Sequence, residues 1–92
     1  MYEIILSKRS AKNLKKLSGK DREKILRALF ALKEDPFLGK PLIGELKGLY
    51  SLRVWPYRIV YEIIKNKLLI HVLHVGHRKD VYKKINKTTL TK

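Results

Sequence analysis

The sequence predicts a single compact α+β domain, residues 1–92, in which two N-terminal helices pack on one face of an antiparallel-dominated sheet. Two consecutive amphipathic segments indicate the helices, and three short apolar segments farther along indicate most of the sheet. Because 45% of the residues are hydrophobic, the chain is able to bury a real core. The expected element order is β-α-α-β-β-β, followed by a short C-terminal helix or tail.

One strand and two helices are expected in the N-terminal part of the chain. Residues 2–6 form a short β-rich run, and Ser7 is placed to cap a helix that ends near Leu17. Ser18 followed by Asp21 resembles a capping box, which opens the second helix. The apolar stripe of this second helix consists of Ile25, Leu26, Leu29, Phe30 and Leu32.

Proline and glycine mark the connection to the C-terminal half. Pro36 stops the second helix, because the residue before a proline is pushed away from helical geometry. Residues 37–48 contain another proline and three glycines, which predicts an irregular but ordered connection.

Three strands are expected after this connection, at about residues 49–55, 57–65 and 68–75. The last two are apolar on both faces, which predicts that they lie in the centre of the sheet. A turn near Asn66 joins them, since asparagine tolerates the positive φ of tight hairpin turns. Gly76 is expected to end the last strand, ahead of a short helix at residues 79–86 and a frayed tail at residues 87–92.

The charge balance points to an anionic partner. The chain has 22 Lys and Arg against 8 Asp and Glu, a formal net charge of +14, so nucleic acid, an acidic protein and an anionic membrane surface are the candidate partners. No apolar run approaches the roughly 20 residues of a membrane-spanning helix. Residues 4–6 are too short an apolar run for a secretory signal, so a cytoplasmic location is expected. The absence of cysteine excludes disulfides and thiolate zinc sites.

Residues 50–61 are the most informative segment, because they predict a hairpin that opposes two arginines. A tight turn centred on the Trp55–Pro56 bond places Arg53 opposite Arg58, since side chains alternate along a strand. Like charges directly opposite each other destabilise a sheet. We therefore interpret the pair as a site for an anion, which we take to be an RNA phosphate. The alternative is a solvated strand face on which the arginine stems cover apolar surface.

The chain resembles the RelE/ParE toxin superfamily, and more specifically the RelE-type messenger-RNA endonucleases, over roughly residues 2–85. The resemblance rests on Leu46-Lys47-Gly48, Leu52-Arg53, the run from Tyr57 to Glu62 and the run from Val75 to Tyr82. It implies a toxin of a type II toxin–antitoxin pair that cuts messenger RNA in the ribosomal A site. It also implies an acidic antitoxin of RelB type, which wraps the toxin and blocks its basic face in a heterocomplex.

The resemblance also implies roles for individual residues of the catalytic centre. Arg53, Arg58 and Arg78 fall on positions whose basic side chains surround the scissile phosphate in RelE-type enzymes. Tyr82 matches a C-terminal tyrosine that stacks on or orients the substrate nucleotide.

Three further residues are expected to contact RNA. Lys47 lies where RelE enzymes place a basic substrate-binding residue. Ser51 departs from the pattern, because a lysine proposed as general base is typical of that position. His77 replaces a basic residue beside the catalytic arginine. Either departure puts the identity of the base in doubt.

The expected chemistry needs no cofactor. RNA carries its own nucleophile, the 2′-hydroxyl, and arginine stabilises phosphorane charge through bidentate contacts and permanent protonation. Histidine is a common general acid and base in proteins, so His77 or Tyr82 is the candidate proton shuttle. A zinc site is not expected, because the spacing of His71, His74 and His77 sends successive rings to alternate faces of a strand.

Two other function classes stay open. One is a binding-only member of the superfamily, either a ParE-like inhibitor of DNA gyrase or a degenerate homologue that docks on RNA or an antitoxin. Ser51 favours this class, because it stands where RelE-type enzymes have the lysine proposed as general base. The other is a basic structural RNA-binding protein, which explains the net charge but not the placement of the arginines.

Overall fold

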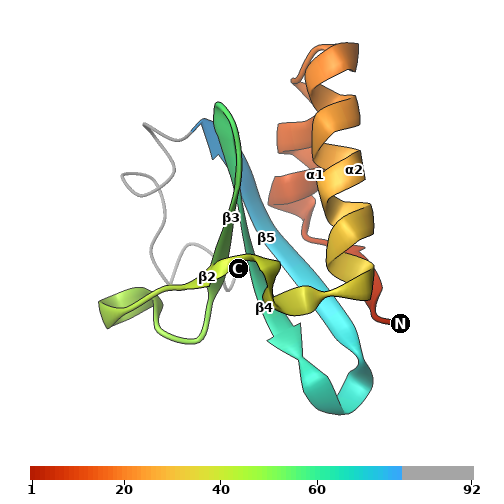
Figure 1. Ribbon diagram of the computed structural model, residues 1–92. Coiled ribbons are helices and arrows are strands. Elements are labelled where there is room, and N and C mark those ends of the chain that lie inside the picture. The colour runs from red at the N-terminus through yellow and green to blue at the C-terminus, as the bar shows by residue number, and fades with distance from the viewer. Residues whose placement is uncertain (78–92) are drawn as a thin grey trace.

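The computed structural model describes residues 1–77, so the helix and tail expected at residues 79–92 lie outside the described part of the chain. Two helices cover one face of a five-stranded mixed sheet, and this confirms the predicted fold class (Figure 1). The helices are α1 (Lys8–Lys15) and α2 (Gly19–Glu34). The strands are β1 (Glu3–Leu6), β2 (Lys40–Pro41), β3 (Tyr50–Val54), β4 (Tyr57–Ile64) and β5 (Leu69–His77).

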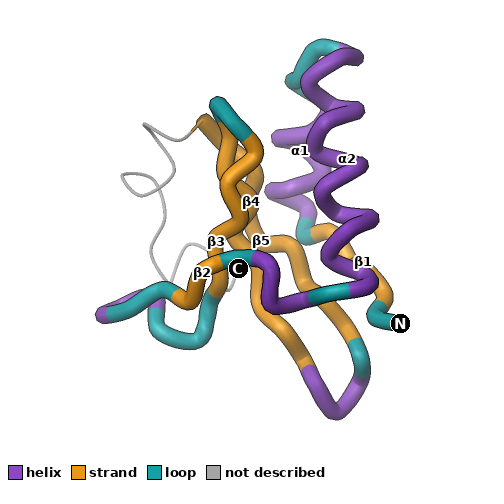
Figure 2. The backbone as a smooth tube through the Cα atoms, in the orientation of Figure 1, coloured by secondary structure: helices purple, strands orange, loops and turns teal. Residues whose placement is uncertain are grey.

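The strand order is β1-β5-β4-β3-β2, with β1 parallel to β5 and every other pair antiparallel. The two apolar strands β4 and β5 are therefore central, as predicted. The tube in Figure 2 shows both helices on the same side of these strands. Within residues 1–77, no helix is both long and apolar enough to cross a membrane.

Both predicted helix caps are present. The hydroxyl oxygen of Ser7 accepts a hydrogen bond from the Ser10 backbone N–H at 3.0 Å, and that of Ser18 accepts one from the Asp21 N–H at 3.2 Å. Each cap satisfies a backbone donor that has no partner inside its helix. Ser10 also ties α1 to the sheet, because its buried hydroxyl donates to the Val72 carbonyl at 3.0 Å.

The predicted apolar stripe of α2 is only partly buried. Ile25, Leu29 and Leu32 are in the core, whereas Leu26 and Phe30 are 49% and 65% exposed. Leu26 and Phe30 lie four residues apart on the flank of the helix that turns away from the sheet, so only part of the apolar stripe faces the core.

The connections also differ from the sequence prediction. Two residues of the connection expected to be irregular, Lys40 and Pro41, pair with β3 as the edge strand β2. The strand β5 continues through Gly76 to His77. The turn between β4 and β5 is a 3-10 turn over Lys65–Lys67, and the positive φ (52°) falls on Leu68 rather than on Asn66. Asn66 lies within the 3-10 turn, and Leu68, which directly follows this turn, adopts the left-handed conformation.

The sheet is packed on both faces. Beneath the helices lies the main core, which includes Ile59 and Tyr61 of β4, both with no exposed surface. Val60 points to the opposite face, because side chains alternate along the strand, and there it packs with Leu49 and Leu73 in a smaller cluster. Leu42 and Leu46 of the β2–β3 connection pack against this smaller cluster.

Candidate active site

The hairpin of β3 and β4 has the predicted register. Arg53 and Arg58 are direct cross-strand partners, on either side of the Trp55–Pro56 turn, whose peptide bond is cis. The residues that alternate with these arginines belong to or pack against the main core under the helices: Tyr50, Leu52 and Val54 of β3, and Tyr57, Ile59 and Tyr61 of β4. Alternation along each strand therefore places both arginines on the face opposite the helices.

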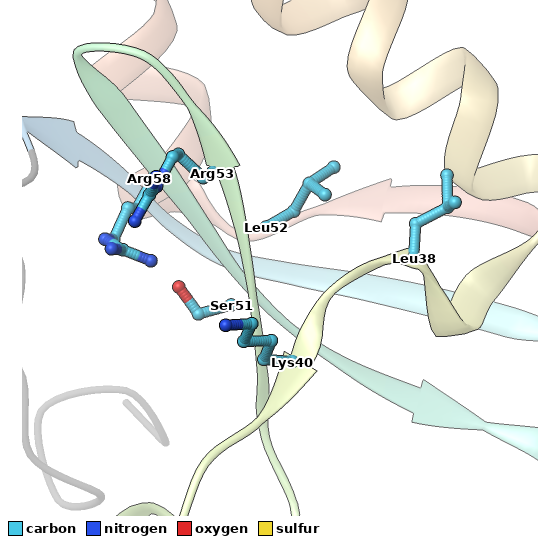
Figure 3. Close-up of a pocket in the computed structure, with 6 residues that line it drawn as sticks. All are labelled: Leu38, Lys40, Ser51, Leu52, Arg53 and Arg58. Carbon is cyan, nitrogen blue, oxygen red and sulfur yellow. The ribbon is translucent and has the colours of Figure 1, made fainter.

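A hollow of about 330 Å³ lies beside this arginine pair. We call it the arginine pocket, and its lining residues are Leu38, Lys40, Ser51, Leu52, Arg53 and Arg58. In Figure 3 the polar side chains of Lys40, Ser51 and the two arginines extend to one side of β3, while Leu38 and Leu52 extend toward the helix layer. The pocket therefore combines cationic groups from three adjacent strands.

Burial differs among the polar residues of the arginine pocket. Arg53 is exposed, Arg58 is half-buried and Ser51 is 3% exposed, so the serine forms part of the pocket wall. A guanidinium group at the mouth of a hollow keeps its positive charge and is well shaped for two parallel hydrogen bonds to a phosphate.

A buried tyrosine positions the β2 side of the pocket. The hydroxyl of Tyr61 donates to the Pro36 carbonyl at 2.7 Å and accepts from the Gly39 N–H at 3.0 Å. Burial raises the pKa of Tyr61 above its ordinary value of 10.0. A Cβ on Gly39 would lie 2.6 Å from this hydroxyl oxygen, so glycine is needed for the close approach. The next residue, Lys40, then pairs with Ser51.

The structure does not bring Lys47 into the arginine pocket. It follows a short 3-10 turn over Gly44–Leu46 and lines a separate hollow of about 590 Å³. Lys65 and the apolar residues Leu49 and Ile63 line the same second hollow. The role expected for Lys47 in RNA binding stays a prediction.

His77 is also placed away from the two arginines. It is the cross-strand partner of Tyr57, and the two rings meet edge to face with their centroids 6.2 Å apart. The Tyr57 hydroxyl donates to the Asp21 carboxylate of α2 at 2.6 Å, so this ring pair lies on the helix side of the sheet. The hydrogen bond to Asp21 raises the pKa of Tyr57 above 10.0. A position on this side does not favour His77 as the proton shuttle beside Arg58.

Two of the predicted catalytic residues, Arg78 and Tyr82, lie outside the described residues, so their predicted roles stay predictions. The other two histidines are placed by the pairing of β4 with β5. A register shift after Val60 puts His74 opposite Val60 and His71 opposite Glu62, with 3.1 Å between the His71 Nδ1 and a Glu62 carboxylate oxygen. The strict alternation expected for the histidines is therefore wrong, because the irregularity places His71 and His74 on one face.

Lys40 is the pocket residue that the sequence reasoning missed. The segment around it was expected to be irregular, and Lys40 pairs with Ser51 of β3 across the whole connection between the two strands. The available signal was the short run Gly39-Lys40-Pro41, because proline in a sheet is confined to edges and so is compatible with an edge strand.

The chain is a small α+β domain that gathers arginines from two strands on one face of its sheet, and comparison with known proteins gives its family. A family model described as the ParE toxin of the type II toxin–antitoxin system parDE matches residues 4–82. The chain is 31% identical over 84 residues to "Toxin RelE" of Mycobacterium tuberculosis, with 89% of this chain and 87% of the relative covered. It is 29% identical over 93 residues to "mRNA interferase toxin RelE" of Escherichia coli, with 97% and 98% covered.

The fold comparison agrees with the sequence comparison. The toxin–antitoxin complex RelBE2 of Mycobacterium tuberculosis superimposes with a TM-score of 0.79 at 30% identity, and 84% of this chain and 98% of that chain are covered. The chain therefore belongs to the RelE/ParE family of toxins from type II toxin–antitoxin systems.

Proposed function

We propose that this toxin is a metal-independent endoribonuclease that cleaves ribosome-bound messenger RNA in the A site and so inhibits translation in the cytoplasm. The observation that carries the proposal is the opposition of Arg53 and Arg58 at the mouth of one pocket. Two like charges directly opposite each other repel and destabilise the sheet. A phosphate bound between the two arginines would offset this repulsion. The similarity to the Escherichia coli relative, which is named an mRNA interferase toxin, supports the same activity.

The proposed chemistry uses the substrate's own nucleophile. The 2′-oxygen attacks the adjacent phosphorus, its proton passes to a protein group or water, and the bond to the leaving 5′-oxygen breaks as that oxygen is protonated. Arg58 and Arg53 stabilise the negative charge that develops on the phosphorane, a role worth roughly 3–4 kcal/mol for each preorganised donor. We retain Arg78 for charge stabilisation and Tyr82 for stacking on the nucleotide and for proton transfer.

The remaining predicted contacts are assigned outside the reacting phosphate. Lys47 lines the second hollow and His77 packs on Tyr57, so we propose that both contact RNA or the ribosome away from the scissile bond. Ser51 forms a wall of the arginine pocket and is proposed to lie beside the substrate backbone.

We also propose an acidic antitoxin of RelB type as the partner. The net charge of +14 favours an acidic protein, and a structural relative was solved as a complex of toxin and antitoxin. Binding over the arginine pocket would block RNA and give an inactive heterocomplex.

Mapping transcript 5′ ends after brief induction tests the proposed activity. New ends inside translated frames are expected for the wild type and not for a variant that carries both Arg53→Ala and Arg58→Ala. A variant that carries both Lys24→Ala and Arg27→Ala is the charge-matched control, because both of these side chains are exposed on α2. Intact transcripts together with altered plasmid supercoiling would instead support the alternative, a ParE-like gyrase inhibitor.

A further inference from the structure

Lys40 enters the arginine pocket from a strand of its own. It is the Cα partner of Ser51 on β3, and Ser51 lies two residues from Arg53 on the same face of that strand. In Figure 3 the Lys40 amine extends to the side of β3 that carries the Ser51 hydroxyl and both guanidinium groups. The three cations therefore face one hollow, at two levels along β3.

The backbone that carries Lys40 is fixed on both sides. Before it, the N–H of Gly39 is held by the buried hydroxyl of Tyr61 at 3.0 Å. After it, Pro41 pairs with Tyr50, and the Leu42 N–H donates to the Leu49 carbonyl at 2.8 Å. The backbone at Lys40 is therefore already ordered before a ligand binds, so binding has to restrict only the side chain.

The spacing of the two levels indicates what Lys40 contacts. Two residues along a strand correspond to about 7 Å, so the Lys40–Ser51 level is displaced from the Arg53–Arg58 level by that distance. An extended polyanion that places one phosphate at the arginines runs past Lys40 with its neighbouring phosphate. Lysine suits this second position, because it acts as a mobile point charge rather than as a planar fork.

We propose that Lys40 is a substrate-binding residue whose ammonium group holds the RNA phosphate next to the scissile one. The proposal rests on the proposed nuclease function. It adds Lys40 to the residues that bind RNA, and it predicts that the RNA strand crosses the sheet from the β3–β4 hairpin toward β2. Because the contact is to a phosphate that does not react, Lys40 strengthens binding of substrate and transition state equally.

Single-turnover cleavage of messenger RNA on programmed ribosomes, followed at increasing protein concentration, separates binding from chemistry. For Lys40→Met the half-saturating concentration is expected to rise about tenfold while the saturating rate stays within about twofold. Lys40→Arg, which keeps the charge, is expected to stay within about threefold of the wild type in both quantities. Lys67→Met is the matched control, because Lys67 lies in the exposed turn after the far end of β4.

Binding of a single-stranded RNA methylated at every 2′-oxygen, which cannot be cleaved, gives a readout independent of activity. One lost phosphate contact is expected to reduce the slope of log affinity against log salt by about 0.7 in Lys40→Met. Lys67→Met should keep the wild-type slope.

The two assays distinguish failure of this inference from failure of the proposed function. If the wild type cleaves RNA and Lys40→Met matches Lys67→Met in both assays, the assignment of Lys40 is overturned while the nuclease function stands. A fall in the saturating rate alone would also overturn it, since Lys40 would then act on the reacting phosphate. If the wild type binds the methylated RNA but cuts no RNA, the nuclease function fails, and the salt slopes still decide whether Lys40 contacts a phosphate. If the wild type neither binds nor cuts RNA, both proposals fall.

Discussion

Tyr61 and Gly39 are joined by a hydrogen bond of 3.0 Å that ties the centre of β4 to the segment leading into β2. The contact is close enough that a methyl group on Gly39 would meet the Tyr61 hydroxyl at 2.6 Å and the Ser51 carbonyl at 3.0 Å. Through this contact, a residue of the main core under the helices determines where the basic edge strand on the rim of the arginine pocket lies.

Gly39→Ala is expected to lower the free energy of unfolding by about 1–3 kcal/mol, since the added methyl overpacks a buried contact. Urea denaturation followed by circular dichroism measures the change. Gly19→Ala is the control, because a Cβ at the start of α2 would meet no atom within 4 Å beyond its chain neighbours and the backbone of its own helix. The stability of this variant should be unchanged or higher. Equal stability of the two variants would contradict the tight contact at Gly39.

Tyr61→Phe is expected to cost about 2 kcal/mol of stability at neutral pH, because two buried backbone groups lose their partner. Unfolded tyrosine ionises near pH 10.0, while the pKa of Tyr61 in the folded protein is raised by burial. Its contribution to stability is therefore complete below pH 10 and is lost as pH rises through the raised pKa. Urea midpoints of wild type and variant should differ by a constant amount from pH 7 to 9 and converge above pH 10; a constant difference at all pH values would disprove the linkage.

The opposition of Arg53 and Arg58 predicts a conflict between stability and activity. Arg53→Thr should raise the free energy of unfolding by about 0.2–1 kcal/mol, because it removes a like-charge pair and introduces a residue that favours strands. Single-turnover cleavage should fall by about 10²–10³-fold in the same variant. Arg53→Lys keeps the repulsion, so its stability should match the wild type while cleavage still falls. Loss of stability in Arg53→Thr would show that the pair is not strained.

The hydrogen bond between Tyr57 and Asp21 predicts a coupling between the hairpin and α2. The carboxylate raises the pKa of the Tyr57 hydroxyl, so Asp21→Asn should bring this pKa back toward 10.0. The measurement is the difference between the ultraviolet titrations of each protein with and without Tyr57→Phe. Stabilities of the two single variants and the double variant should give a coupling energy of about 1 kcal/mol. An unchanged titration in Asp21→Asn would contradict the contact.

Local chemistry made much of the fold predictable. The caps at Ser7 and Ser18 depend on a donor three residues away, and the opposition of Arg53 and Arg58 depends on the centre of one short turn. The caps are predictable because they depend on neighbours within one helical turn, and the arginine pair because turn position and strand alternation determine it.

The features that were missed depend on distant partners. Gly39, the residue before β2, donates a hydrogen bond to a hydroxyl 22 residues farther along the chain, and the pairing of β2 with β3 brings Lys40 to the pocket. The face on which His77 lies is determined by the register of β5 on β4, and a slip of one residue would reverse it. No local pattern specifies either register. The sequence therefore placed Arg53 opposite Arg58, but it did not show that Lys40 lines the same pocket or that Lys47 lines a separate hollow.

The parallel pairing of β1 with β5 has a consequence for synthesis of the protein. The strand made first, Glu3–Leu6, is hydrogen-bonded to one of the last parts of the described chain, with Glu3 opposite Leu69. The sheet therefore cannot form completely until translation has passed that point. Until then, the two helices have no complete sheet to pack against. Polypeptides released early by a premature stop codon are accordingly expected to be degraded instead of folding.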